Sequence, residues 1–176
     1  MYILSDQIKS LSVISLQTGE TVAMTTGPII DPSKLEIIAF SCKPAGDKQH
    51  PILLTQDIRQ LTQNALLIDG YDEIEEASEI IRLQDILVQR FQLTNCRVEN
   101  ESGTNLGKVE DYSLNVETYL INKLYVKRPL LKSLAKGSLV IDRTQIVDVK
   151  RDKIVVRDAT VAELAAVRQP GILPGS

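Results

Sequence analysis

The feature that most constrains this chain of 176 residues is an internal repeat, since its two halves carry the same order of turns and apolar segments. An offset of 84 residues aligns Gly19 with Gly103, Ile14 with Val98, Ala23 with Gly107, Leu35 with Tyr119 and Ile37 with Ile121. Further along the chain the offset becomes 88 residues and aligns Ile58 with Ile146. Chance similarity between two β-rich halves is the alternative, but the shared order of elements favours a repeat.

Each half contains short segments of β-forming residues that are separated by polar turns. The expected strands are Val13–Leu16, Lys34–Phe40, Asn64–Asp69, Tyr119–Val126, Leu139–Ile141, Ile146–Val149 and Lys153–Val156. Many short strands within about 75 residues favour a closed or nearly closed barrel, because closure removes exposed sheet edges. The sequence therefore predicts a mainly β fold with two tandem small antiparallel β-barrels, over residues 1–71 and 91–160.

The segment 72–90 differs from both predicted barrels in pattern and in charge. Its apolar residues follow helical spacing, and its net charge is −4. We expect an acidic helical linker, with a helix within Ala77–Arg90 that joins the barrels and offers an apolar side for packing between them. Beyond the second barrel, residues 161–176 are expected to form a short helical turn at Val161–Ala166, followed by a flexible C-terminal tail.

One hairpin of the second half matches a known pattern. The segment 103–112 resembles the opening hairpin of the PRC-barrel family, in which a glycine, three residues, a second glycine, any residue, a valine, any residue and an aspartate begin the barrel. Gly103, Gly107, Val109 and Asp111 fit these positions. The resemblance extends over about residues 5–70 and 90–158. The first half departs from the pattern, because an alanine replaces the second glycine and a threonine stands in place of the valine.

The physical chemistry of this hairpin agrees with the pattern. Glycine at a tight hairpin permits positive φ or close backbone approach, which gives Gly19, Gly103 and Gly107 a structural role. Val109 is expected to face the barrel interior, with its two neighbours facing water. The resemblance implies a docking module without common catalytic residues, as in the cytoplasmic part of the photosynthetic reaction-centre H subunit and the C-terminal domain of the ribosome maturation factor RimM.

Residue types that carry chemistry are few and scattered. His50 is the sole histidine and stands in a polar loop, where a solvated residue is a better interpretation than a general base. Cys42 and Cys96 lack a CxxC spacing and are interpreted as buried apolar residues. The acidic residues around 69–79 lack the spacing of a calcium loop. We therefore expect no catalytic residue, no metal, no cofactor and no small-molecule substrate.

The second predicted barrel carries an excess of positive charge, with a net charge of +3 over residues 91–160. A basic run between and around two of its strands is the candidate partner-binding surface, formed by Lys123, Lys127, Arg128, Lys132, Lys136 and Arg143. Such a surface binds phosphates or an acidic protein. A solvated basic face without a partner is the alternative. Aromatic residues make up only 4% of the chain, which argues against a base-stacking platform.

These features favour a binding protein over an enzyme. We expect a non-catalytic adaptor or scaffold that docks on other cytoplasmic macromolecules, with a protein as partner. The alternative is a factor of RNA metabolism or ribosome maturation that uses the basic surface of the second barrel. A membrane-proximal role would require a membrane partner, because no apolar run reaches the roughly 18–20 residues of a spanning helix. The N-terminus does not resemble a secretion signal, so a cytoplasmic location is expected.

Overall fold

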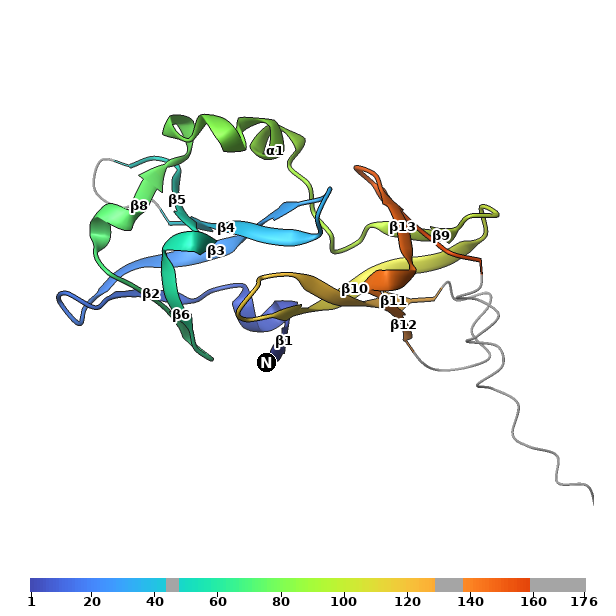
Figure 1. The fold of residues 1–176 in the computed structure, drawn as a ribbon, viewed down its shortest axis with the longest axis horizontal. Helices are drawn as coiled ribbons and strands as arrows, with labels where there is room; N and C mark the ends of the chain where they lie inside the picture. Colours follow the sequence, from blue (N-terminus) through green and yellow to red (C-terminus); the bar gives the residue numbers. More distant parts are fainter. Residues whose placement is uncertain (44–47, 129–137, 159–176) are drawn as a thin grey trace, which may run out of the picture.

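The structure is a computed structural model that describes residues 1–43, 48–128 and 138–158. It is mainly β, with a single short α-helix in the described part of the chain (Figure 1). In the N-terminal half the strands are β1 (Tyr2–Leu4), β2 (Ser12–Ser15), β3 (Thr21–Asp31), β4 (Glu36–Cys42), β5 (Pro51–Leu54), β6 (Ile58–Leu61), β7 (Ala65–Ile68) and β8 (Ile74–Glu76). Helix α1 (Gln84–Gln89) follows. In the C-terminal half the strands are β9 (Arg97–Asn100), β10 (Asn105–Asn115), β11 (Ile121–Lys127), β12 (Leu139–Asp142), β13 (Ile146–Val149) and β14 (Lys153–Val156).

The strands form two curled sheets that repeat one strand order. The first sheet runs β6-β7-β2-β3-β4-β5-β8, and the second runs β12-β11-β10-β9-β14-β13, with β1 paired on β10. Each sheet contains one parallel pair, β2 with β7 and β9 with β14, among antiparallel neighbours. Figure 1 shows the two sheets side by side along the long axis of the molecule.

The repeat extends to the register of single residues. Ile30 pairs with Ile37 in the first sheet, and the residues 84 positions later, Leu114 and Ile121, pair in the second. Irregularities in the strand pairing recur as well. The register shift between residues 25 and 27 of β3 matches the register shift between residues 109 and 111 of β10. Such bulges bend a strand locally, so both long strands curl at the same place.

The alignment of Ile14 with Val98, made from the sequence, is wrong by a single position. Val13, and not Ile14, occupies the place of Val98, because Val13 pairs with Ala23 and Leu66 while Val98 pairs with the equivalent residues of its own sheet. The loop between β2 and β3 is one residue longer than the loop between β9 and β10. The offset before this loop is therefore 85 residues.

The two sheets meet at the tips of their central hairpins. Leu35 and Tyr119 hold these tips with positive φ angles of 47° and 56°. The N–H of Ile37 donates to the carbonyl of Tyr119 at 3.0 Å, and the N–H of Ile121 donates to the carbonyl of Leu35 at 2.9 Å. Because each bond is the counterpart of the other at an offset of 84, the halves are related by a pseudo-two-fold axis between Glu36 and position 120.

The hydrophobic core is continuous across this junction. Buried residues of both halves belong to one cluster, and the rings of Phe40 and Tyr119 contact edge to face with centroids 6.3 Å apart. Arg143 fastens the same junction, since its guanidinium donates to the carbonyls of Leu35 and Ile121 at 3.0 and 3.2 Å and to that of Lys34. The two halves thus share one hydrophobic core.

The segment that leads into each half packs on the other half. Strand β1 precedes the first sheet but pairs with β10 of the second. The N–H of Ser5, just after β1, donates to Asp111 at 3.1 Å, and its hydroxyl donates to the same oxygen. Helix α1 precedes the second sheet but lies against the first, where Leu83, at the residue before the helix, packs with Ile52 and Leu54.

The expectation of a helical linker over residues 72–90 is confirmed only in part, since α1 lies within the expected Ala77–Arg90 but residues 74–76 form a strand. Only α1 is α-helical, and β8 is a strand that pairs with β5 of the first sheet. Ile74 is 1% exposed, so its burial against that sheet outweighs the helical spacing of the sequence. Arg90, with a φ of 47°, ends the helix. The helical segment covers the first sheet and does not pack between the halves; the expected helical turn and tail at 161–176 lie outside the described residues.

Candidate functional site

Among the described residues, the predicted basic side chains do not form one surface. Lys132 and Lys136 lie outside the described residues. Arg143 directs its donors at backbone carbonyls of the junction and is not free to bind a partner. Lys123 is exposed on β11 opposite Asp142 of β12, at the far end of the strand from Lys127.

The neighbourhood of Lys123 is locally neutralised. The backbone N–H and the hydroxyl of Thr144 donate to Asp142 and lower the pKa of this carboxyl, to which the positive charge of Lys123 contributes. Lys123 therefore faces a carboxylate that is ionised at neutral pH. Lys123 therefore already has an anionic neighbour. The candidate partner-binding site lies at the other end of β11.

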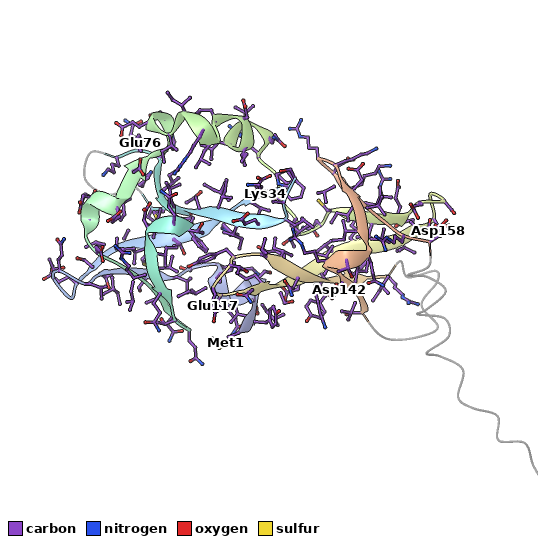
Figure 2. The ribbon with its side chains drawn as sticks, in the orientation of Figure 1. Met1, Lys34, Glu76, Glu117, Asp142 and Asp158 are labelled. Atoms are coloured by element: carbon purple, nitrogen blue, oxygen red, sulfur yellow. The ribbon has the colours of Figure 1, made fainter. Side chains whose placement is uncertain are left out.

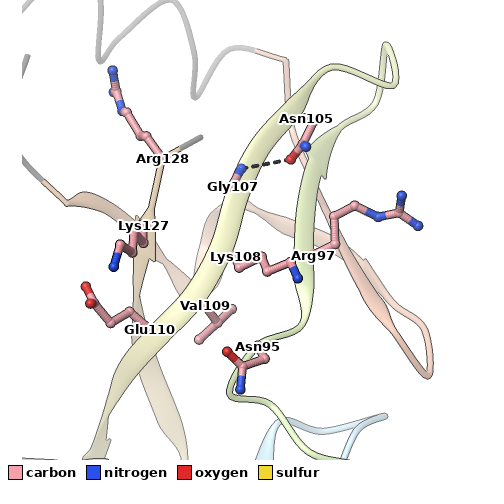
Figure 3. Close-up of a pocket in the computed structure, with 9 residues that line it drawn as sticks. All are labelled: Asn95, Arg97, Asn105, Gly107, Lys108, Val109, Glu110, Lys127 and Arg128. Atoms are coloured by element: carbon pink, nitrogen blue, oxygen red, sulfur yellow. Dashed lines mark hydrogen bonds between the residues drawn. The ribbon is translucent and has the colours of Figure 1, made fainter. Parts of the chain in front are cut away.

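Lys127 and Arg128 line a groove on the second sheet that encloses about 480 Å³ (Figure 3). The groove is lined by Asn95, Arg97, Asn105, Gly107, Lys108, Val109, Glu110, Lys127 and Arg128. Four of these side chains are cationic and one is anionic, and none is aromatic. An open, basic groove of this kind suits an anionic ligand.

Three of the cations are direct neighbours across adjacent strands. Lys108 of β10 is the register partner of Arg97 on β9 and of Lys127 on β11. All three are exposed on the same side of the sheet. We call Arg97, Lys108 and Lys127 the basic row. Adjacent strands lie about 4.8 Å apart, so the row places like charges at close spacing.

Few carboxylates offset this row. Arg97 lies 3.8 Å from Asp152, and both side chains are more than half exposed, at 51% and 78%. No described carboxylate lies within 4.0 Å of the ammonium groups of Lys108 and Lys127. Like charges directly opposite each other across strands are destabilising, by about 0.2–1 kcal/mol for a pair. The repulsion within the basic row thus lowers the stability of the fold, and packing does not explain why three cations stand at these positions.

The glycine hairpin positions the row. Val109 is fully buried, so its neighbours Lys108 and Glu110 point outward along β10. Gly107 has a φ of +139°, and a Cβ atom there would lie 2.0 Å from the carbonyl oxygen of Lys127. Only glycine lets β10 approach β11 this closely at the edge of the groove. The N–H of Gly107 donates to the Asn105 side chain at 3.0 Å and is occupied.

The two turn glycines have a different role. Gly19 and Gly103 have φ angles of +73° and +80°, and nothing lies within 4 Å of a Cβ at either position. They are needed for backbone conformation alone. In the first half Thr25 stands where Val109 stands in the second, and its buried hydroxyl accepts from the N–H of Leu11 at 2.8 Å. The threonine in place of a valine is therefore accommodated by a hydrogen bond.

The first half provides an internal comparison for the groove. Its counterparts of Arg97 and Lys108 are Ser12 and Met24, which pair with each other in the same register. The third cation has a basic counterpart, Lys43. The same fold is thus built with a neutral pair at the position where the second half has two cations.

Sequence reasoning missed Arg97 and Lys108, because they stand outside the basic run and approach it only when β9, β10 and β11 pair. A comparison of outward-facing positions between the two halves would have found them. The cysteines are buried, and burial raises the thiol pKa of Cys42 to about 11 and also raises that of Cys96. His50 is exposed, and its backbone N–H donates to Glu76 at 3.1 Å.

Comparison with known proteins leaves the architecture as the main guide. No protein-family model matches the chain, and no curated protein sequence matches it. Within residues 1–43, 48–128 and 138–158, no group of three or more histidine, cysteine, aspartate or glutamate side chains is arranged to hold a metal ion. The helices in this part of the chain are too short or too polar to cross a membrane.

Proposed function

We propose that this protein is a non-catalytic adaptor that docks an acidic region of a partner protein in the groove of its C-terminal half. The observation that carries the proposal is the basic row, formed by Arg97, Lys108 and Lys127. A bound chain of carboxylates would relieve the mutual repulsion of these cations. Exposed charges of one sign also steer an oppositely charged partner and speed its association.

A protein partner is favoured over RNA by the lining of the groove. None of the groove residues is aromatic, so bases would find no ring on which to stack. Carboxylates need only the ammonium and guanidinium groups that the groove presents. An RNA-associated role remains the competing function, and the experiment below separates the two.

The proposal includes a family assignment. We infer that each half of the chain is a PRC-barrel-like unit, and that the protein acts in the cytoplasm. The hairpin pattern of Gly103, Gly107 and Val109 supports this assignment, as does the strand order that both halves repeat. Members of that family serve as docking modules, which agrees with a binding function.

The test replaces groove residues with the residues that the first half carries at the same positions. The double variant Arg97→Ser/Lys108→Met removes two cations while using side chains that this fold already accommodates. Its matched control, Arg151→Ser/Lys150→Met, removes the same charge from the exposed turn between β13 and β14. Fluorescence anisotropy measures binding of a labelled deca-glutamate peptide and of a decanucleotide of single-stranded RNA.

We expect the groove variant to bind deca-glutamate about tenfold more weakly, since two exposed charge contacts are each worth up to about 1 kcal/mol. The control variant should bind within twofold of the unchanged protein. Equal losses in both variants would show that net charge alone drives binding, and would refute the groove. Tighter binding of RNA than of the peptide, lost in the groove variant, would replace the adaptor function with the RNA-associated one.

A further inference from the structure

The pseudo-symmetry exposes a difference at one sheet edge. In the first sheet the outer edge of β5 is covered by β8, with Ile52 paired to Glu75 and Leu53 paired to Ile74. Strand β12 is the counterpart of β5 at an offset of 88 residues. No described strand pairs with its outer edge. Figure 2 labels Glu76 at the end of β8 and Asp142 at the end of β12.

The strand that covers β5 is short, acidic and held by polar contacts. Its sequence is Ile74-Glu75-Glu76, with the isoleucine buried. Lys48 donates to the carbonyl of Ile74 at 2.6 Å, and the carboxylate of Glu76 accepts the backbone N–H of Gln49 at 3.0 Å. The first half thus shows which kind of segment this edge accepts: one apolar residue followed by carboxylates, in extended conformation.

The edge of β12 has the properties of an open acceptor. Val140, the counterpart of Ile52, is 41% exposed, whereas Ile52 is 3% exposed and packs with Ile80 and Leu83 of the segment that follows β8. Lys127 and Arg128, at the end of the neighbouring strand β11, place positive charge beside this edge. Unpaired edge strands with an apolar side chain readily pair with another extended chain.

The chain itself is poorly matched to this edge. At the offset of 88 residues the counterpart of Ile74-Glu75-Glu76 is Ala162-Glu163-Leu164. This triplet has alanine in place of the β-branched residue and retains one of the two carboxylates. Alanine is depleted in strands, and the charge complementarity to Lys127 is halved. The chemistry therefore favours a segment of another protein.

We propose that β12 accepts an extended acidic segment of the partner protein by antiparallel strand addition. The segment carries a β-branched apolar residue followed by at least two carboxylates, which lie toward Lys127 and Arg128. Backbone hydrogen bonds to β12 provide the binding energy, and side-chain contacts select the sequence. This inference rests on the adaptor function and specifies the conformation of the segment that the adaptor binds.

The probe is a labelled synthetic peptide with the sequence of residues 70–79 of this chain, added in trans to the full-length protein. The variant Val140→Glu places a like charge beside the peptide at a position that is 41% exposed. Val147→Glu is the matched control, since Val147 is 51% exposed on β13, at the opposite edge of the same sheet. A peptide that is N-methylated at Glu75, whose N–H faces the accepting strand in this register, tests whether backbone hydrogen bonds are required.

We expect Val140→Glu to weaken peptide binding about fivefold, the effect of a like-charge pair across strands, with Val147→Glu unchanged. Amide exchange of residues 139–142 should slow when the peptide is bound, and the methylated peptide should not bind. Absence of binding, or protection of β13 in place of β12, would overturn the proposal. Binding of deca-glutamate that persists in Val140→Glu but fails in Arg97→Ser/Lys108→Met would leave the adaptor function standing without strand addition.

Discussion

The close approach of β10 to β11 at Gly107 makes a sharp stability prediction. The substitution Gly107→Ala adds a Cβ atom 2.0 Å from the carbonyl oxygen of Lys127, 2.8 Å from its carbonyl carbon and 3.0 Å from a methyl of Val126. The oxygen and carbon belong to the backbone of a paired strand, so they cannot turn away as a side chain would. Strand β10 or β11 must shift by more than an ångström.

Two costs add at this position. Forcing an extra carbon into a packed site costs about 1–3 kcal/mol. The φ of +139° costs a non-glycine residue about a further 1–3 kcal/mol. Gly107→Ala is therefore expected to lower the free energy of unfolding by about 4 kcal/mol. Gly103→Ala meets nothing within 4 Å at a φ of +80°, so only a backbone cost of about 1 kcal/mol applies.

Urea unfolding followed by circular dichroism measures both variants. With a denaturant slope of about 2 kcal/mol per molar, the midpoint should fall by about 2 M for Gly107→Ala and by about 0.5 M for Gly103→Ala. The difference between the two variants isolates the steric contact from the backbone conformation. Equal midpoints would refute the reasoning, because they would show that β10 and β11 are not closely apposed at this residue.

Three further predictions concern the junction, the N-terminal segment and a buried thiol. Arg143→Met should lower the free energy of unfolding by about 1–3 kcal/mol, because it removes the hydrogen bonds from a charged guanidinium to backbone carbonyls of the junction; thermal melting that is unchanged would count against this role. Asp111→Ala should release the segment around Ser5, seen as faster amide exchange at residues 2–8, and unaltered exchange would argue against the contact. Since burial raises the thiol pKa of Cys42 to about 11, its protonated form is favoured in the folded state, and stability should decline as pH rises from about 9 toward 11. Cys42→Ala should flatten that decline, and a slope identical to that of the unchanged protein would contradict the assignment.

Periodicity and alignment predicted the parts of the fold that depend on local sequence. The pairs Leu35 with Tyr119 and Ile58 with Ile146 occupy equivalent places, since turn conformation and strand burial constrain their neighbours in the same way in each half. Single positions in a loop are less constrained. The loop between β2 and β3 contains one extra residue, which the residue types of the turn do not indicate. The sequence alignment of Val98 was therefore displaced by one position.

Long-range pairing escaped prediction. No local pattern shows that β1 pairs with the second sheet or that Ile74 begins a strand on the first. The same applies to the candidate site. Arg97 and Lys108 are isolated in sequence, and only strand register brings them beside Lys127. Conversely, Arg143 belongs to the basic run by position, yet its guanidinium is used at the junction.

The proposed function places the acidic partner protein in the groove of the second half and not on the first half. Photo-cross-linking in cells tests this directly, with benzoylphenylalanine at Glu110 in the groove or at Thr26, its exposed counterpart 84 residues earlier. We expect an adduct with a protein that carries an acidic segment from position 110, and no adduct with that protein from position 26. Adducts of equal yield from both positions, or adducts with RNA from position 110, would contradict it.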